Sequence, residues 1–142
     1  MAVPRTDVEL AEAGTSSRSA LHVFRELIAL PELAREKGAT RMVKTRITRG
    51  DESMLLWLNV DTDTGSGFDA SVFEAPPEFP DLKPGLVLFV SDSEVLDWAV
   101  IYAGILSGGY SLRVARSRLP EADRAAYDSY IGVNVYTPLP SD

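Results

Sequence analysis

Hydrophobic residues recur along this chain with two different periods, and the period changes after Gly38. In residues 18–30 they are three and four positions apart, which is typical of a helix with one apolar face. Ser16 and Ser17 precede this segment and offer side-chain oxygens for an N-cap. Pro31 is expected to begin a second, short helix that ends at Gly38. The first part of the chain is therefore predicted to be helical.

Beyond Gly38 the pattern predicts strands. Residues 41–49 alternate between apolar and polar side chains, as in a strand with one face in water. Met54–Val60 and Leu86–Val90 are apolar on both faces and are expected to be central strands. Further strands are expected over residues 68–72, 97–102, 105–115 and 133–136, and the Gly108-Gly109 pair suggests a bulge or a sharp bend in the third of these.

These elements together predict an α+β domain. Its N-terminal helix would pack on a curved antiparallel sheet of five or six strands in a meander, followed by a short C-terminal helix over Glu121–Tyr130. Residues 1–15 lack a strong period and are expected to form a mobile N-terminal tail. Residues 16–142 would then form the single α+β domain.

Composition limits the classes of protein that fit. The chain has 142 residues and no cysteine, which excludes a disulfide scaffold and cysteine-ligated zinc. No run of 18 or more uncharged apolar residues exists, so we expect no transmembrane helix. The charged start of the chain does not resemble a signal peptide, and a cytoplasmic location is expected.

Charge is unevenly distributed over the sequence. The formal net charge is −7, yet residues 50–97 hold eleven acidic residues and one lysine, a local charge of −10. An acidic surface repels nucleic acid and anionic lipid and attracts cationic partners. Two interpretations stay open: a solvated face that keeps the protein in solution, or a docking patch for a basic protein. The docking candidates are Asp61, Asp63, Asp69 and Glu74.

The sequence offers little catalytic chemistry. His22 is the only histidine, and a metal site built on it would need several converging carboxylates. The GxSxG elbow, the phosphate-binding loops and a complete calcium loop are all absent. Bases on residues 41–49 have no interleaved aromatic residues, which argues against nucleic-acid binding. We therefore expect no cofactor and no metal.

One stretch, residues 93–118, stands out as a possible ligand site. Asp97 and Trp98 enter a predicted strand there, and Tyr110 and Arg113 follow the paired glycines. An acid, two aromatic rings and a guanidinium are able to hold a polar ligand. The other interpretation is that the rings belong to the core and that the acid is satisfied internally.

A resemblance rests on this stretch and its surroundings. The pattern resembles the YegJ-like family of small uncharacterised bacterial domains over roughly residues 41–131, through Leu56-Trp57, Pro77, Leu82-Lys83-x-Gly85, Asp97-Trp98, Gly104, Gly108-Gly109-Tyr110-Ser111 and Arg113. Two positions depart from that pattern: Ala103 stands where Asp or Asn is usual, and Ser111 where Thr is usual. The resemblance implies a small α+β domain with a curved antiparallel sheet. It implies no reaction, cofactor or catalytic residue.

Two functions from different classes follow. The first is a non-enzymatic acidic protein-binding domain, such as an inhibitor or immunity protein that caps a basic partner enzyme. The alternative is a small-ligand-binding protein or enzyme with its site around Asp97, Trp98, Tyr110 and Arg113. The balance favours the first, because no nucleophile–base pair, metal set or phosphate loop is present.

Overall fold

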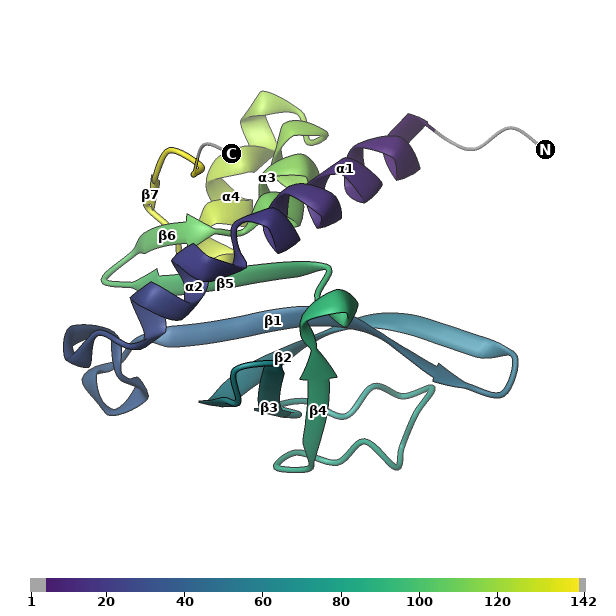
Figure 1. Cartoon of the computed structure of the whole chain (residues 1–142). Coiled ribbons are helices and arrows are strands. Elements are labelled where there is room, and N and C mark those ends of the chain that lie inside the picture. Colours follow the sequence, from purple (N-terminus) through teal and green to yellow (C-terminus); the bar gives the residue numbers. More distant parts are fainter. Residues whose placement is uncertain (1–4, 141–142) are drawn as a thin grey trace.

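The chain is an α+β domain built on one seven-stranded sheet, as a computed structural model that describes residues 5–140 shows (Figure 1). The strand order is β4-β3-β2-β1-β5-β6-β7, and every pairing is antiparallel except that of β6 with β7. The strands are β1 (Thr40–Arg49), β2 (Glu52–Asp63), β3 (Gly67–Ser71), β4 (Val87–Ser91), β5 (Asp97–Tyr102), β6 (Ile105–Gly108) and β7 (Val135–Tyr136). The α-helices are α1 (Arg5–Ser19), α2 (Leu21–Ile28), α3 (Tyr110–Ser117) and α4 (Glu121–Ile131). Three 3-10 turns complete the list: η1 (Pro31–Leu33), η2 (Arg35–Lys37) and η3 (Asp92–Glu94).

The predicted architecture, a meander of five or six strands under one N-terminal helix, is wrong. The sheet has seven strands, and the chain does not run through it in sequence order. After β4, at one edge, it crosses through η3 to pair β5 with β1 in the middle of the sheet. Two hydrogen bonds fix this crossing: Leu96 N–H donates to Lys44 O (2.8 Å), and the Thr45 hydroxyl donates to Glu94 O (2.9 Å).

The N-terminal segment also differs from the prediction. Residues 5–15, expected in a mobile tail, belong to helix α1, which continues through Gly14 to Ser19. Residues 1–4 lie outside the described residues. Ser17 is buried inside the helix, where its hydroxyl donates to Gly14 O (2.9 Å) and its carbonyl accepts from the Trp98 indole (3.0 Å). Contacts with the sheet therefore compensate for the weak apolar period of this helix.

The strand predicted over residues 105–115 ends early. β6 stops at Gly108, and α3 begins at Tyr110. Gly108 and Gly109 both have positive φ, 73° and 67°, which glycine adopts without the steric cost that other residues incur. Two such residues in succession turn the chain out of the strand and into a helix, so the glycine pair is not a bulge within a strand.

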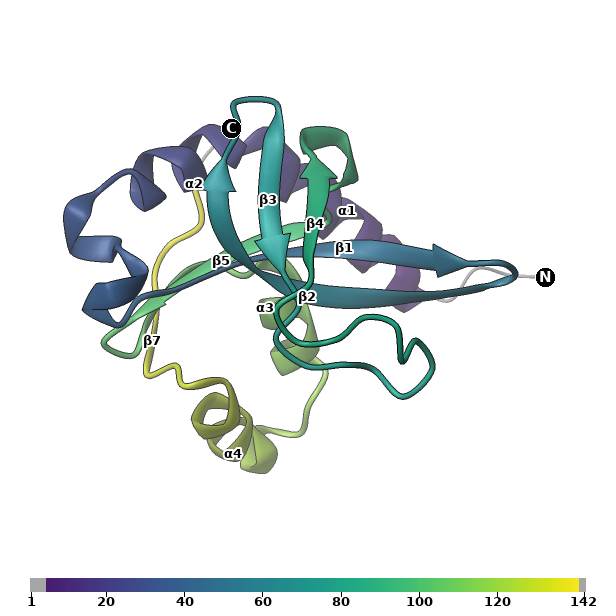
Figure 2. The ribbon, with the colours of Figure 1, turned by 90° about the horizontal axis from the view of Figure 1, so that it is seen from below.

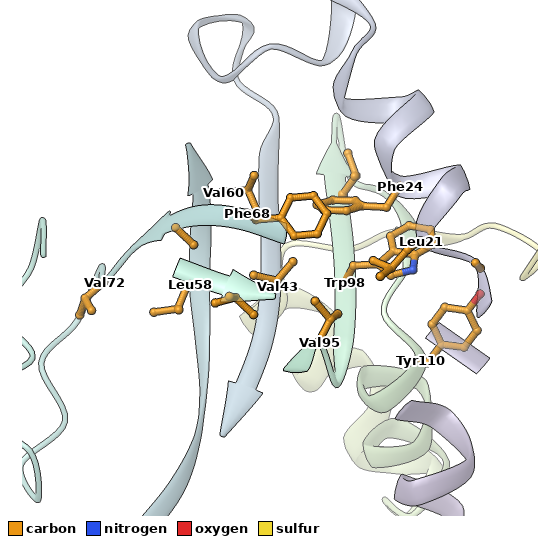
Figure 3. Close-up of a cluster of buried hydrophobic side chains, with 14 of the residues drawn as sticks. Leu21, Phe24, Val43, Leu58, Val60, Phe68, Val72, Val95, Trp98 and Tyr110 are labelled. Carbon is orange, nitrogen blue, oxygen red and sulfur yellow. The ribbon is translucent and has the colours of Figure 1, made fainter. Parts of the chain in front are cut away.

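The core lies mainly between one face of the sheet and helices α1 and α2. Phe24 of α2 lies 5.3 Å, ring centre to ring centre, from both Phe68 and Trp98, and Trp98 meets Tyr110 at 5.9 Å (Figure 3). Leu58, at the centre of β2, is fully buried in the same cluster. A smaller cluster around Leu106, Val133 and Ala99 forms on the other face. That face is covered by helix over only part of its width.

The segment Leu86–Val90, predicted as a central strand, forms an edge. β4 pairs with β3 alone. The side chains of Val87 and Phe89 are each 54% exposed, whereas Val90 is 2% exposed. Its apolar run therefore does not reflect burial on both faces.

Candidate functional site

Asp97 forms the most completely bonded polar group among the predicted site residues. It opens β5 and is fully buried. Its Oδ1 accepts hydrogen bonds from the backbone N–H of Trp98 (2.7 Å) and of Tyr110 (3.0 Å). Its Oδ2 accepts from the N–H (2.7 Å) and the hydroxyl (2.5 Å) of Ser111. The carboxylate thus satisfies the first N–H groups of α3 and fastens that helix to β5.

Burial raises the pKa of Asp97, and the hydrogen bonds from Ser111, Trp98 and Tyr110 oppose that rise. No surface of this side chain is exposed to a ligand. The arrangement is therefore suited to holding α3 in place rather than to exchanging protons with a substrate.

The other three residues of the predicted ligand site are not grouped around a cavity. Trp98 is fully buried and Tyr110 is 6% exposed, both inside the aromatic core. Arg113 lies on α3, where its Nε donates to Gly108 O (2.9 Å) and its guanidinium lies 5.6 Å from the Tyr136 ring centre. No ion pair joins Arg113 to Asp97 in the described chain. These four residues stabilise the junction of β5, β6 and α3.

The four predicted docking acids divide into two pairs. Asp61 forms an ion pair with Arg35, and Asp63 forms one with Arg25 (3.0 Å), so arginines from the N-terminal helical segment neutralise both. Asp69 on β3 and Glu74 in the following loop form no ion pair within residues 5–140. The carboxylates of Asp69 and Glu74 therefore stay available for cations of a partner.

The free edge of β4 adjoins Asp69. Val72 N–H donates to Leu86 O (2.9 Å), and Asp92 N–H donates to Ser66 O (3.1 Å), so the even-numbered positions of this strand bond toward β3. Because bonding direction alternates along an antiparallel strand, the backbone groups of Val87 and Phe89 point away from β3. β4 is the end strand of the sheet and pairs with β3 alone, beside which it lies in Figure 2.

Two hollows lie along the sheet, and the smaller of them is closed on one side by helix α1. The larger, of about 900 Å³, is a mostly apolar groove with Met42, Trp57 and Ile101 among its lining residues. Its walls come from the loop residues 73–77 and from the end of α4, which lie on the same side of the sheet in Figure 2. The smaller, of about 600 Å³, adjoins α1 and is lined by residues that include Arg18, Lys44 and Arg46. Sequence reasoning missed both hollows.

Other classes of site find no support in the part of the chain that the structure describes. No group of three or more His, Cys, Asp or Glu side chains gathers there in a way that suits a metal ion. None of the described helices has the length and apolar character needed to cross a membrane.

Comparison with known proteins identifies the family of this chain and assigns it no function. Among curated proteins and among solved structures, nothing matches the chain. The family model DUF2314, whose description reads "uncharacterized protein conserved in bacteria", matches residues 7–135. The expectation of a small uncharacterised bacterial domain is thereby confirmed. Since the match spans most of its length, the chain belongs to DUF2314, a family of uncharacterised proteins conserved in bacteria.

Proposed function

We propose that this domain is a non-enzymatic binding protein that takes up an extended, basic segment of a partner protein along the free edge of β4. The observation that supports it is the edge itself: five uncharged residues, Val87–Ser91, with Val87 and Phe89 each 54% exposed. Edge strands of soluble proteins are usually protected by charge, proline, a bulge or a covering element. β4 carries no charge and no proline, which favours a partner as the cover.

Strand addition would use the groups that β4 leaves unpaired. An added strand gains its affinity from backbone hydrogen bonds and its specificity from alternate side chains. Val87 and Phe89 offer both, since their N–H and C=O groups face outward and their side chains are exposed. A segment of about five residues suffices to pair with the whole strand.

The negative charges of Asp69 and Glu74 favour a basic partner. Asp69 lies directly opposite Phe89 in the ladder, and Glu74 follows β3 in the chain. Neither acid forms an ion pair among the described residues, so lysine or arginine side chains on a bound strand would find them available. Complementary charge raises association rates by about 10- to 1,000-fold at low salt.

Three finer expectations belong to the same proposal: an inhibitor or immunity role toward a basic enzyme, the YegJ-like affiliation, and a cytoplasmic location. The alternative enzyme or ligand site around Asp97 gains no support, because that carboxylate is buried and its acceptors are occupied.

The test is a titration of ¹⁵N-labelled protein with a ten-residue peptide of alternating lysine and valine, beside a matched glutamate–valine peptide. We expect saturable binding of the lysine peptide, with the largest amide shifts at Val87 and Phe89, and weaker binding as salt rises. Val87→Pro removes an outward N–H without changing charge and should abolish binding while the fold survives. Asp69→Lys should weaken it.

The control is Glu26→Lys, which makes the same charge change on the exposed face of α2 and should leave binding unchanged. Equal binding of the two peptides, or shifts confined to other elements, would contradict the proposal. Shifts at β4 that grow with protein concentration and without peptide would identify a second copy of the chain as the occupant instead.

A further inference from the structure

The groove and the smaller hollow meet at one residue. Leu55 on β2 contributes to the lining of both. Register explains the junction: on this face of the sheet, Lys44 pairs with Trp57, and the next pair along is Arg46 with Leu55. A cationic surface therefore passes directly into an apolar one.

Three cations line the smaller hollow, Arg18, Lys44 and Arg46, and only Lys44 lies beside an acid, Asp97, its neighbour across the ladder. Arg18 donates to Val95 O (3.0 Å) and to the Thr15 hydroxyl (3.5 Å), Lys44 to the Ser111 hydroxyl (3.3 Å) and Arg46 to the Ser53 hydroxyl (3.4 Å). None of the three forms an ion pair within the described chain. Of the other described arginines, five form ion pairs, namely Arg25, Arg35, Arg49, Arg116 and Arg118, whereas Arg41, Arg113 and Arg124 bond to backbone carbonyls. In a chain of net charge −7, the gathering of three cations around one hollow, with no acidic side chain among its lining residues, favours an anionic ligand.

Lys44 is the residue that links the two parts. It lies between Asp97 of β5 and Trp57 of β2 in one row across the sheet, with its Nζ 5.9 Å from the Trp57 ring centre. The four hydrogen bonds to Asp97 come from Trp98, Tyr110 and Ser111, so Lys44 reaches that carboxylate only through the Ser111 hydroxyl. Its ammonium keeps donors available for a second anion.

The groove supplies the apolar half of the site. Met42, Trp57, Ile101 and Leu112 lie among its lining, and Glu74 is the one charged side chain there. Its volume of about 900 Å³ falls within the range of about 300–1,000 Å³ typical of small-molecule sites.

We infer that this face of the sheet binds a free long-chain carboxylate, with its head group at Lys44, Arg46 and Arg18 and its chain running over Leu55 into the groove above Trp57. Lys44 and Arg46 donate to the carboxylate oxygens, and the hydrocarbon chain removes apolar surface of the groove from water. This site shares Glu74 with the proposed partner surface but does not include β4, and its test does not depend on peptide binding there.

The probes are dodecanoate, dodecanol and dodecyltrimethylammonium, each kept below the concentration at which it aggregates. Calorimetry measures the affinity of each probe. The indole N–H signals of the two tryptophans in the ¹H–¹⁵N spectrum show where on the protein the probe binds. We expect dodecanoate to bind one to one and to shift the Trp57 signal, while the buried Trp98 signal stays. Dodecanol should bind at least about tenfold more weakly, because it lacks the charge-assisted hydrogen bonds.

Variants distinguish the binding of the ligand's carboxylate head group from the binding of its hydrocarbon chain. The double variant Lys44→Gln with Arg46→Gln should weaken dodecanoate binding about tenfold or more and leave dodecanol unchanged. Lys44→Arg, which keeps the charge, should retain binding, and Leu55→Asp should weaken both ligands. Arg49→Gln, on the same strand but outside both hollows, is the matched control, and thermal melts show that each variant folds.

The inference is overturned if the cationic amphiphile or dodecanol binds as tightly as dodecanoate, or if the double glutamine variant binds like the native chain. It is equally overturned if dodecanoate shows no saturable binding, or if it shifts Trp98 rather than Trp57.

Discussion

Strands β4 and β5 have similar apolar sequences and opposite surroundings. In β5, the first four residues, Asp97–Val100, are at most 2% exposed, because β1 and β6 flank the strand and helices pack on it. In β4, Val87 and Phe89 are each 54% exposed, because only β3 pairs with it. An apolar run thus indicates a strand, and its place in the sheet decides whether that run is core or binding surface.

Two aspartates repeat this contrast. Asp97 is buried and accepts four hydrogen bonds that position α3. Asp69, on the outer part of the sheet, forms no ion pair in the described residues and stands opposite the exposed Phe89. The inner strands hold the architecture, and the outer strands carry the groups that remain available for a partner.

The sharpest test of this contrast compares two phenylalanines. Phe24→Ala should lower the free energy of unfolding by about 3–5 kcal/mol, because Phe24 packs between Phe68 and Trp98 with no exposed surface. Phe89→Ala should change it by less than about 1 kcal/mol, since half of that side chain already faces water. Urea denaturation of both variants measures the difference. Equal losses would show that β4 belongs to the core.

The aspartates give the next largest effect. Asp97→Ala should cost about 2–3 kcal/mol, because it leaves the buried N–H groups of Tyr110 and Ser111 without an acceptor. Asp69→Ala should stay within about 0.5 kcal/mol, as surface substitutions usually do. Chemical denaturation is the measurement, and loss of helical circular dichroism should accompany the first variant only.

Two glycines with positive φ extend the comparison to the backbone. A Cβ on Gly108 would overlap the Trp98 indole, so Gly108→Ala should cost more than about 2 kcal/mol through overlap and strain together. Gly85, in the loop before β4, has φ of 90° and no atom within 4 Å of such a Cβ. Gly85→Ala should therefore cost only the conformational strain of about 1 kcal/mol. Melting temperatures that fall equally would remove the distinction.

The smallest expected effect concerns pH. Hydrogen bonds from Arg116 (2.8 Å) and from the Tyr136 hydroxyl (2.5 Å) lower the pKa of Asp128. Because the pKa is lower in the folded state, this carboxylate stabilises the fold above its unfolded pKa of about 3.9 and loses that contribution as pH falls through the folded value.

Asp128→Asn should therefore flatten the loss of stability as pH falls below about 4 in thermal melts. An Asp128→Asn variant that loses stability with acid as steeply as the native chain would contradict the assignment.

The sequence by itself determined those elements whose signals are local. The alternation of residues 41–49 appears as β1, the apolar run from Met54 lies within β2, and the helix expected from Glu121 appears as α4, which ends at Gly132 with φ of 76°. Pro31 begins a short helix and Gly38 ends the next one. Side-chain period, proline and glycine act over a few residues, so the chain shows them directly.

Only the tertiary structure decided what depends on residues far apart in the chain. Helix α1 is held at Ser17 by Trp98, and α3 is capped by Asp97 from a separate strand. Arg25 and Arg35 neutralise two of the four predicted docking acids, and Leu55 joins a cationic hollow to an apolar groove. A local pattern carries no record of which segments meet, because burial, ion pairing and cavity shape arise when the strands take their order in the sheet.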